Sequence, residues 1–455
     1  MKQLNQEEAK RICDRVLSFS HADECSVAVN GSRQGNIRFA RNSVSTAGLN
    51  EDRRLSVTVA FGRRQGTASS NEFDDKSLEQ AVRRAEATAR LAPENPEYVP
   101  VPGKQEFKAS AEYFAATAAI DPDFRAEVAS HAILAGRNKK LVTAGFFTDT
   151  TGFETIANSK GLFGHRAFTG LDFTCTARTE DGRGSGWVTR SAVDAKRFDA
   201  REASEVAMEK ALRSVDAKAL EPGRYTVILE PAATSELLGR MFGGFGARQA
   251  DEGRSFLAKK GGGNRLGEKL FDEQINVWTD PWDKDVPVSP WDSGSMLARQ
   301  RRDMIKDGKI ANLEYSRFWA QKNGVAPTAR AGNMIMAGGS KSLEELIAGT
   351  RKGVVVTRTW YIRMVDPQSV LLTGLTRDGT FYVENGKIKY PIKNFRFNES
   401  PITMLNNVEE LGKPVVIGPD EVAYQMVIPP MRIRDFSRFG FTEVLFPGLD
   451  PATDD

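Results

Sequence analysis

A proline-rich stretch near residue 100 is the feature that most constrains how this chain can fold. Residues 92–104, APENPEYVPVPGK, contain four prolines in thirteen residues. Proline lacks an amide donor and holds the residue before it in extended geometry, so helices and inner strands end at such a stretch. A single hydrophobic core stops growing near about 250–300 residues, and this chain has 455. We therefore expect several domains, with residues 92–104 as an interdomain linker.

The periodicity of apolar residues predicts a small strand–helix domain over residues 1–104. Residues 6–17 have the pattern of an amphipathic helix, and Asp74 or Asp75 can cap a second helix. Three short strands are expected between them, over residues 26–29, 37–40 and 55–61, with breaks at Asn30-Gly31 and at Asn50. We expect the second helix to cover a small antiparallel sheet.

Residues 105–220 predict a middle domain in which helices flank an antiparallel sheet. The first helix begins at a capping Asp121 with Pro122 in its first turn, and a second helix is expected over 198–215. Four strands are expected between them, over residues 141–148, 162–168, 171–177 and 186–191, with breaks that include Gly152 and Gly170.

Residues 221–455 predict a larger β-rich domain with interspersed helices, which makes the whole chain α+β. Helices are expected over 232–245 and 342–349, the second with Ser342 and Glu345 as a capping box. Turn signals at Asp307-Gly308, Asp378-Gly379 and Asn385-Gly386 each predict a hairpin.

Composition excludes several classes of function. A net charge of +3 is too small to indicate nucleic acid or an anionic membrane as a partner. The chain shows no signal-peptide pattern and no run of about 18 apolar residues, so we expect a cytoplasmic protein. Cys13, Cys25 and Cys175 are odd in number and scattered, which favours reduced, buried thiols over disulfides.

No intact zinc-hydrolase motif or catalytic triad is present in the sequence. Zinc requires several converging imidazole, thiolate or carboxylate ligands, commonly with two of them one turn apart on a helix. His21, His131 and His165 are isolated from one another, and ordinary surface or core roles explain them best. The Gly-rich segment around Ser185 does not have the G-x-S-x-G spacing, and a turn is the better interpretation.

The segment YTVILEPAATSELLGRMFGG, residues 225–244, resembles the TldD/PmbA family, whose members were once called modulators of DNA gyrase. The resemblance continues through residues 254–257, 301–313, 331–334, 383–387 and 404–408, and so covers most of the chain. In the peptidase branch of this family, the helix carries an H-E-x-x-x-H pattern that binds the metal and supplies a base. The resemblance places Gly239, Arg240 and Gly244 at the first His, the Glu and the second His.

These replacements make this chain similar to the PmbA/TldE branch, whose chains carry no metal and pair with a TldD-type subunit. The family's cysteine ligand near the C-terminus is also missing, because no cysteine follows Cys175. The resemblance thus implies no metal or cofactor in this chain and zinc only on a TldD-type partner. It also implies peptide processing by the pair, with this chain as the non-catalytic subunit.

Four residues are candidates for contact with a peptide or with a partner subunit: Gly243, Arg248, Ser255 and Asn333. One alternative is a stand-alone peptide-binding scaffold or regulator of the same fold, which would form a dimer with itself. Another is an enzyme that uses unrelated residues near the helix, with Arg240, Asp251 and Glu252 as the first positions to mutate. The helix glycines have a packing explanation as well, since they permit close approach of a neighbouring backbone.

Overall fold

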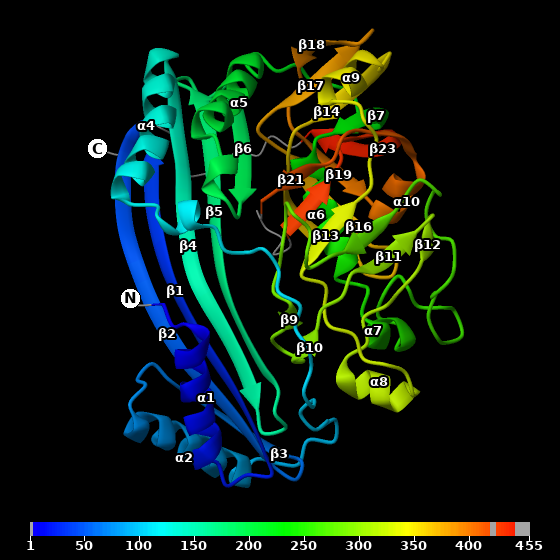
Figure 1. Ribbon diagram of the computed structural model, residues 1–455. Helices are drawn as coiled ribbons and strands as arrows, with labels where there is room; N and C mark the ends of the chain where they lie inside the picture. Colours follow the sequence, from blue (N-terminus) through cyan, green and yellow to red (C-terminus); the bar gives the residue numbers. More distant parts are fainter. Residues whose placement is uncertain (1–2, 419–424, 442–455) are drawn as a thin grey trace.

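A computed structural model describes residues 3–418 and 425–441 of the chain. Its first part is a six-stranded antiparallel sheet of order β3-β2-β1-β4-β5-β6 (Figure 1). Four of these strands are 17 to 19 residues long, so this sheet is long and narrow. The strands are β1 (Glu24–Ala40), β2 (Ser43–Phe61), β3 (Arg64–Ser70), β4 (Leu141–Asn158), β5 (Phe163–Thr179) and β6 (Ser185–Ala192).

The predicted strand breaks at Asn30-Gly31, Asn50, Gly152 and Gly170 are wrong, because all four positions lie inside the long strands. The first turn falls instead at Arg41 and Asn42, whose φ angles of 51° and 56° suit a tight hairpin. Gly31 is needed for close packing, because a Cβ there would lie 2.4 Å from the ring of Phe153. Strands β1 and β4 pair directly, so the sheet continues across the proline-rich stretch, and the domain boundary at residue 104 stays a prediction.

Four helices cover one face of this sheet, two at each end (Figure 1). The caps at Asp74 and Asp121 are confirmed, since each side chain accepts a hydrogen bond from an amide in the first turn. The helices at the lower end are α1 (Gln6–Phe19) and α2 (Asp75–Leu91), and those at the upper end are α4 (Pro122–Asn138) and α5 (Ala200–Arg213). A short helix α3 (Ala115–Ala118) and a 3-10 turn η1 (Ala195–Arg197) lie outside this set.

The C-terminal part contains a nine-stranded and a six-stranded sheet, which share one core. The nine-stranded sheet has the order β15-β16-β19-β23-β7-β14-β17-β18, with β20 paired to β23. Its strands are β7 (Gly223–Leu229), β14 (Lys352–Val356), β15 (Thr359–Asp366), β16 (Leu371–Thr376), β17 (Thr380–Glu384), β18 (Lys387–Pro391), β19 (Phe395–Glu399), β20 (Val408–Leu411) and β23 (Met431–Phe441).

The six-stranded sheet has the order β12-β11-β8-β13-β22-β21 and contains one parallel pair, β13 with β22. Its strands are β8 (Val277–Thr279), β11 (Arg302–Lys306), β12 (Lys309–Ile310), β13 (Asn333–Met336), β21 (Val415–Ile417) and β22 (Gln425–Ile428). A separate two-stranded ribbon joins β9 (Trp291–Asp292) to β10 (Leu297–Ala298).

Two of the three predicted hairpins are confirmed, at Asp307-Gly308 and Asn385-Gly386. The hairpin at Asp378-Gly379 is wrong, because the strands on either side of it, β16 and β17, lie far apart in the sheet order. Asp378 instead binds Ser185 Oγ at 2.6 Å and Arg358 Nη1 at 3.1 Å, which ties the C-terminal part to β6.

Helix α6 (Pro231–Phe242) lies between the two C-terminal sheets and contacts strands of both. Three of its side chains, Leu237, Leu238 and Met241, are at most 1% exposed and belong to the shared core. The other helices of this part are α7 (Ala247–Asp251), α8 (Arg317–Asn323), α9 (Leu343–Ala348) and α10 (Pro401–Asn406). Among residues 3–418 and 425–441, no helix combines the length and apolar character that crossing a membrane requires.

Candidate functional site

The C-terminal end of α6 opens onto a pocket of about 410 Å³. Gly239 and Arg240 lie in the last turn of the helix, and Gly243 caps it. The helix is shorter than the predicted span of 232–245, so Gly244 lies in the turn that follows it. All four residues line the pocket. The three positions that the resemblance assigns to ligands and base therefore face one cavity.

Ser255 lines the same pocket and connects the two chain segments around it, at Gly244 and Leu257. Its hydroxyl donates to the carbonyl of Gly244 at 2.7 Å and accepts from the amide of Leu257 at 3.0 Å. Phe256 closes the space beside Gly244, where an added Cβ would lie 3.0 Å from the ring. Ser255 is 3% exposed, so its described hydrogen bonds hold the chain after α6 in place.

Other residues of the pocket were not singled out in the sequence. Arg254 adds a second guanidinium and binds Glu252. Arg254 itself belongs to the resemblance, over residues 254–257, which was the signal that could have drawn attention to it. Met364, Pro367 and Val370 come from the β15–β16 hairpin, more than a hundred residues away, and no local pattern marks them.

Arg248 lies outside the pocket lining and binds the proline-rich stretch to α7. It makes a bidentate ion pair with Glu97, in which both N–O distances are 2.8 Å. Its guanidinium also lies over the ring of Trp319. The guanidinium holds the pKa of Glu97 below its usual value. This contact holds residue 97 against the C-terminal part of the chain.

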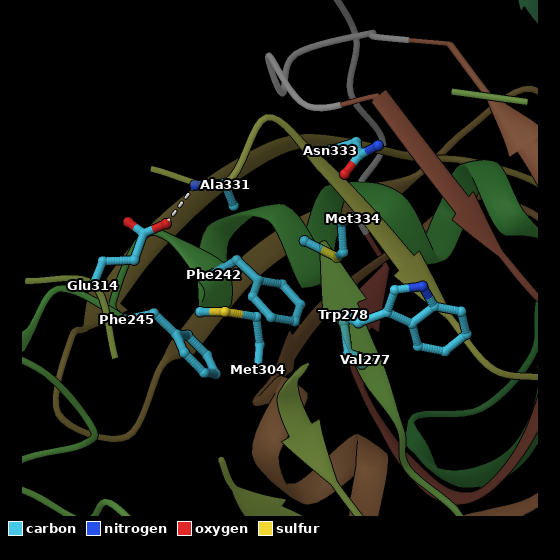
Figure 2. Close-up of a pocket in the computed structure, with 9 residues that line it drawn as sticks. All are labelled: Phe242, Phe245, Val277, Trp278, Met304, Glu314, Ala331, Asn333 and Met334. Carbon is cyan, nitrogen blue, oxygen red and sulfur yellow. Dashed lines mark hydrogen bonds between the residues drawn. The ribbon is translucent and has the colours of Figure 1, made fainter. Parts of the chain in front are cut away.

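Asn333 also lies outside that pocket, beside a much smaller cavity of about 20 Å³ on another side of the α6 end. Figure 2 shows Asn333 above Met334, away from the Phe242, Phe245 and Met304 side chains. Its amide group donates to the carbonyls of Asp280 and Val286 and accepts from Thr279 Oγ1 and the Asp280 amide. Through these four hydrogen bonds, the Asn333 side chain holds the loop that follows β8.

Asp251 and Glu252 form hydrogen bonds and ion pairs near the pocket. Asp251 accepts hydrogen bonds from Asn264 Nδ2 and Trp319 Nε1, each at 2.7 Å. Glu252 pairs with Arg254 and Arg248, and these two cations lower its pKa. Neither acid lines the pocket beside Arg240.

The pocket residues do not fit the zinc ion that a metallopeptidase helix would hold. Two of the three positions have no side-chain donor, and the third carries a guanidinium, which is always protonated. Within residues 3–418 and 425–441, no cluster of three or more His, Cys, Asp or Glu side chains is arranged to bind a metal ion. The described donors give no reason to place a metal here, and no reaction step is derived through one.

The histidines and cysteines lie elsewhere, in the first sheet and its helices, except His21, which lies in the loop between α1 and β1. His165 accepts or donates a 2.8 Å hydrogen bond with Thr155 Oγ1, and His131 lies 3.5 Å from Glu127. Burial raises the pKa of the Cys13 and Cys175 thiols to about 12, so these thiols stay protonated at neutral pH.

Comparison with known proteins assigns the family. Sequence models of the PmbA/TldA metallopeptidase domain 1, central domain and C-terminal domain match residues 25–89, 71–215 and 222–440. A relative from Escherichia coli O157:H7, the metalloprotease PmbA, is 24% identical over 455 residues, which cover 95% of this chain and 98% of that protein. A metalloprotease from Methanothermobacter thermautotrophicus is 23% identical over 293 residues, covering 60% of this chain and 62% of that protein.

The fold agrees with a solved structure. TldE from Thermococcus kodakarensis superposes with a TM-score of 0.85 at 17% identity, covering 95% of this chain and 99% of that one. The family models, the relatives and the three-part α+β architecture agree, so this chain belongs to the TldD/PmbA family of metallopeptidase-related proteins.

Proposed function

We propose that this chain is the non-catalytic, PmbA/TldE-like subunit of a cytoplasmic TldD-type metallopeptidase that processes peptides or unfolded polypeptides. The observation that carries the proposal is that Gly239, Arg240 and Gly244 face one pocket. The resemblance assigns these three positions to the family's ligands and base. In this proposal the zinc and the base are on a partner subunit, with which the chain forms a dimer.

Electrostatics supports the same assignment. Two like unit charges about 4 Å apart repel by about 4 kcal/mol at an effective dielectric constant of about 20, and a divalent ion doubles the charge product. Arg240 and Arg254 both line the pocket and none of its lining residues is a carboxylate, so the lining offers a metal ion no anionic ligand, while Glu252 beside the pocket pairs with Arg254. The lining thus suits the polar groups of a peptide better than a divalent cation.

The test is to purify the chain alone and together with a TldD-type subunit that has an intact H-E-x-x-x-H pattern. After dialysis, zinc is measured by mass spectrometry, and cleavage of an unfolded polypeptide is followed on gels. We expect zinc and cleavage only in the pair, and loss of both when the partner's motif histidines are replaced by alanine. Stoichiometric zinc and cleavage by this chain alone would refute the proposal.

The same experiment separates the alternative of a stand-alone scaffold. A chain that binds unfolded polypeptide but never associates with a TldD-type subunit is a binding protein of the same fold, and the subunit assignment then fails.

A further inference from the structure

A second and larger hollow lies at the other end of α6. It has a volume of about 780 Å³ and separates the upper end of the first sheet from the two C-terminal sheets. Helix α5 and strand β6 form one wall, and α9, β18 and β21 contribute to the other (Figure 1). Glu230, Pro231 and Ala232, at the start of α6, lie between the walls. We call this hollow the interdomain groove.

Three sheet edges meet at the interdomain groove. Strand β6 is an outermost strand of the first sheet, β18 of the nine-stranded sheet and β21 of the other six-stranded sheet. Each of the three supplies lining residues, among them Trp187, Ile388 and Val415. Strand β21 contacts β6, but no ladder joins them in the described part of the chain. Edge strands present unpaired amides and carbonyls, which an added extended strand can satisfy.

The lining between these edges is mainly apolar. Trp187 and Phe381 are 6% and 3% exposed, and Ile388 packs with the side chains of α9. A volume of about 780 Å³ falls within the range of about 300–1,000 Å³ that bound small ligands or a few side chains occupy. The groove is therefore large enough for apolar side chains of a bound segment.

The groove is lined by charged side chains, of which some form ion pairs with each other. Lys210 and Glu230 form an ion pair at 2.6 Å and neutralise each other, with 17% and 14% of their side chains exposed. Lys387 and Lys413 are exposed at the rim, and so is Glu344. Five cationic side chains and three carboxylates line the groove, five minus three, which leaves a net charge of +2. The rim thus attracts a negatively charged group on whatever occupies the groove.

We propose that the interdomain groove binds an extended polypeptide segment that carries apolar side chains and at least one carboxylate. The segment adds a strand to a free edge, places its apolar side chains against Trp187 and Phe381, and sets its carboxylate near Lys387 and Lys413. This inference rests on the proposed function and assigns the polypeptide a site on this chain that is distinct from the pocket of Arg240.

The groove and the pocket lie at opposite ends of one helix. Helix α6 has 12 residues, and at 1.5 Å per residue it is about 18 Å long. Because α6 is buried between the two C-terminal sheets, a segment held in the groove must pass around it. About six further residues in extended form, at about 3.3 Å each, are therefore the fewest that could reach its other end. The groove would anchor one segment of a polypeptide while the next segment of the same polypeptide lies at the pocket of Arg240.

The test uses reduced, carboxymethylated α-lactalbumin labelled with fluorescein, an acidic polypeptide that cannot refold. Its binding to the full chain is measured by fluorescence anisotropy for Val415→Glu and Lys387→Glu. Val325→Glu is the matched control for the first, since Val415 and Val325 are 43% and 45% exposed and Val325 does not line the groove. Lys260→Glu, also exposed and not a lining residue, makes the same change in net charge as Lys387→Glu.

We expect each groove variant to weaken binding at least about five-fold, a change equivalent to about 1 kcal/mol, and each control variant less than about two-fold. A photo-crosslinking residue at position 415 should also capture the probe. Equal affinity in all four variants, no capture at 415, or no binding by the wild-type chain would overturn the inference. Zinc content and cleavage by the pair with a TldD-type subunit are separate readouts, so the proposed function can stand or fail independently.

Discussion

Removing Arg125 should destabilise the first sheet far more than removing a typical surface arginine. Arg125 on α4 makes two hydrogen bonds to Asp149 on β4, at 2.5 and 3.0 Å. The two side chains are 6% and 3% exposed. Gly35 on β1 makes room for the guanidinium, because a Cβ there would lie 1.9 Å from Nη2 of Arg125. The ion pair therefore has almost no access to water.

The expected size follows from this burial. Breaking a buried ion pair by removing one partner costs about 3–5 kcal/mol, because the remaining charge stays buried without compensation. For a folding unit of about 150–250 residues, each kcal/mol lowers the melting temperature by about 2–4 °C. Arg125→Met should thus lower the melting temperature of the unit that contains the first sheet by about 6–20 °C, measured by circular dichroism and differential scanning fluorimetry.

Two controls make this prediction specific. Arg15 pairs with Asp75 on the surface, with 51% and 64% of the side chains exposed, so Arg15→Met should cost less than about 1 kcal/mol. The double variant Arg125→Met with Asp149→Leu removes both charges and should regain most of the lost stability. If Arg125→Met and Arg15→Met melt within about 2 °C of each other, the argument from burial is wrong.

Three further predictions test other parts of the chain. Burial lowers the pKa of His165 from its ordinary 6.5, so the unfolded state binds more protons below that pH. The wild-type melting temperature should therefore fall more steeply than that of His165→Asn as pH decreases from 6.5, and parallel curves would contradict this. Gly186→Ala places a Cβ 2.1 Å from the carbonyl of Ala207 on α5 and should cost about 1–3 kcal/mol in urea unfolding, whereas Gly170→Ala, with open space around it, should be neutral or stabilising. Arg248→Ala should speed proteolysis of the 92–104 stretch several-fold at limiting protease, and an unchanged cleavage rate would show that the Glu97 ion pair does not hold it.

Local chemistry in the sequence predicted the N-terminal ends of three helices well. Asp74, Asp121 and Ser342 each cap a helix as expected, and Glu345 completes the predicted capping box. These signals depend only on residues within one turn of each other. The α+β class followed from the same kind of local pattern and is confirmed.

Glycines inside the long strands were the main source of error, and the reason is physical. A Cβ at Gly31 would lie 2.4 Å from the Phe153 ring, and one at Gly152 would lie 2.5 Å from the Phe168 ring. Each of these two glycines is covered by the aromatic side chain of the residue directly opposite it on the neighbouring strand. A single sequence does not show which strands are neighbours, so such a glycine cannot be told from one in a turn. The pocket residues contributed by the β15–β16 hairpin were missed for the same reason.

Helix α6 has one side that packs in the core and one end that faces the pocket. Leu237, Leu238 and Met241 fill the core between the two C-terminal sheets, and truncating a buried leucine of this kind costs about 2–5 kcal/mol. Gly243, by contrast, has only the carbonyl of Arg240 within 4 Å of an added Cβ, at 3.6 Å, and faces the pocket. Packing therefore constrains the core side of the helix, whereas the pocket side has room for a side chain at Gly243 and much less at Gly244, where a Cβ would lie 3.0 Å from the Phe256 ring. The family's helix persists here because two sheets pack around it, which is a requirement independent of whether the pocket binds zinc.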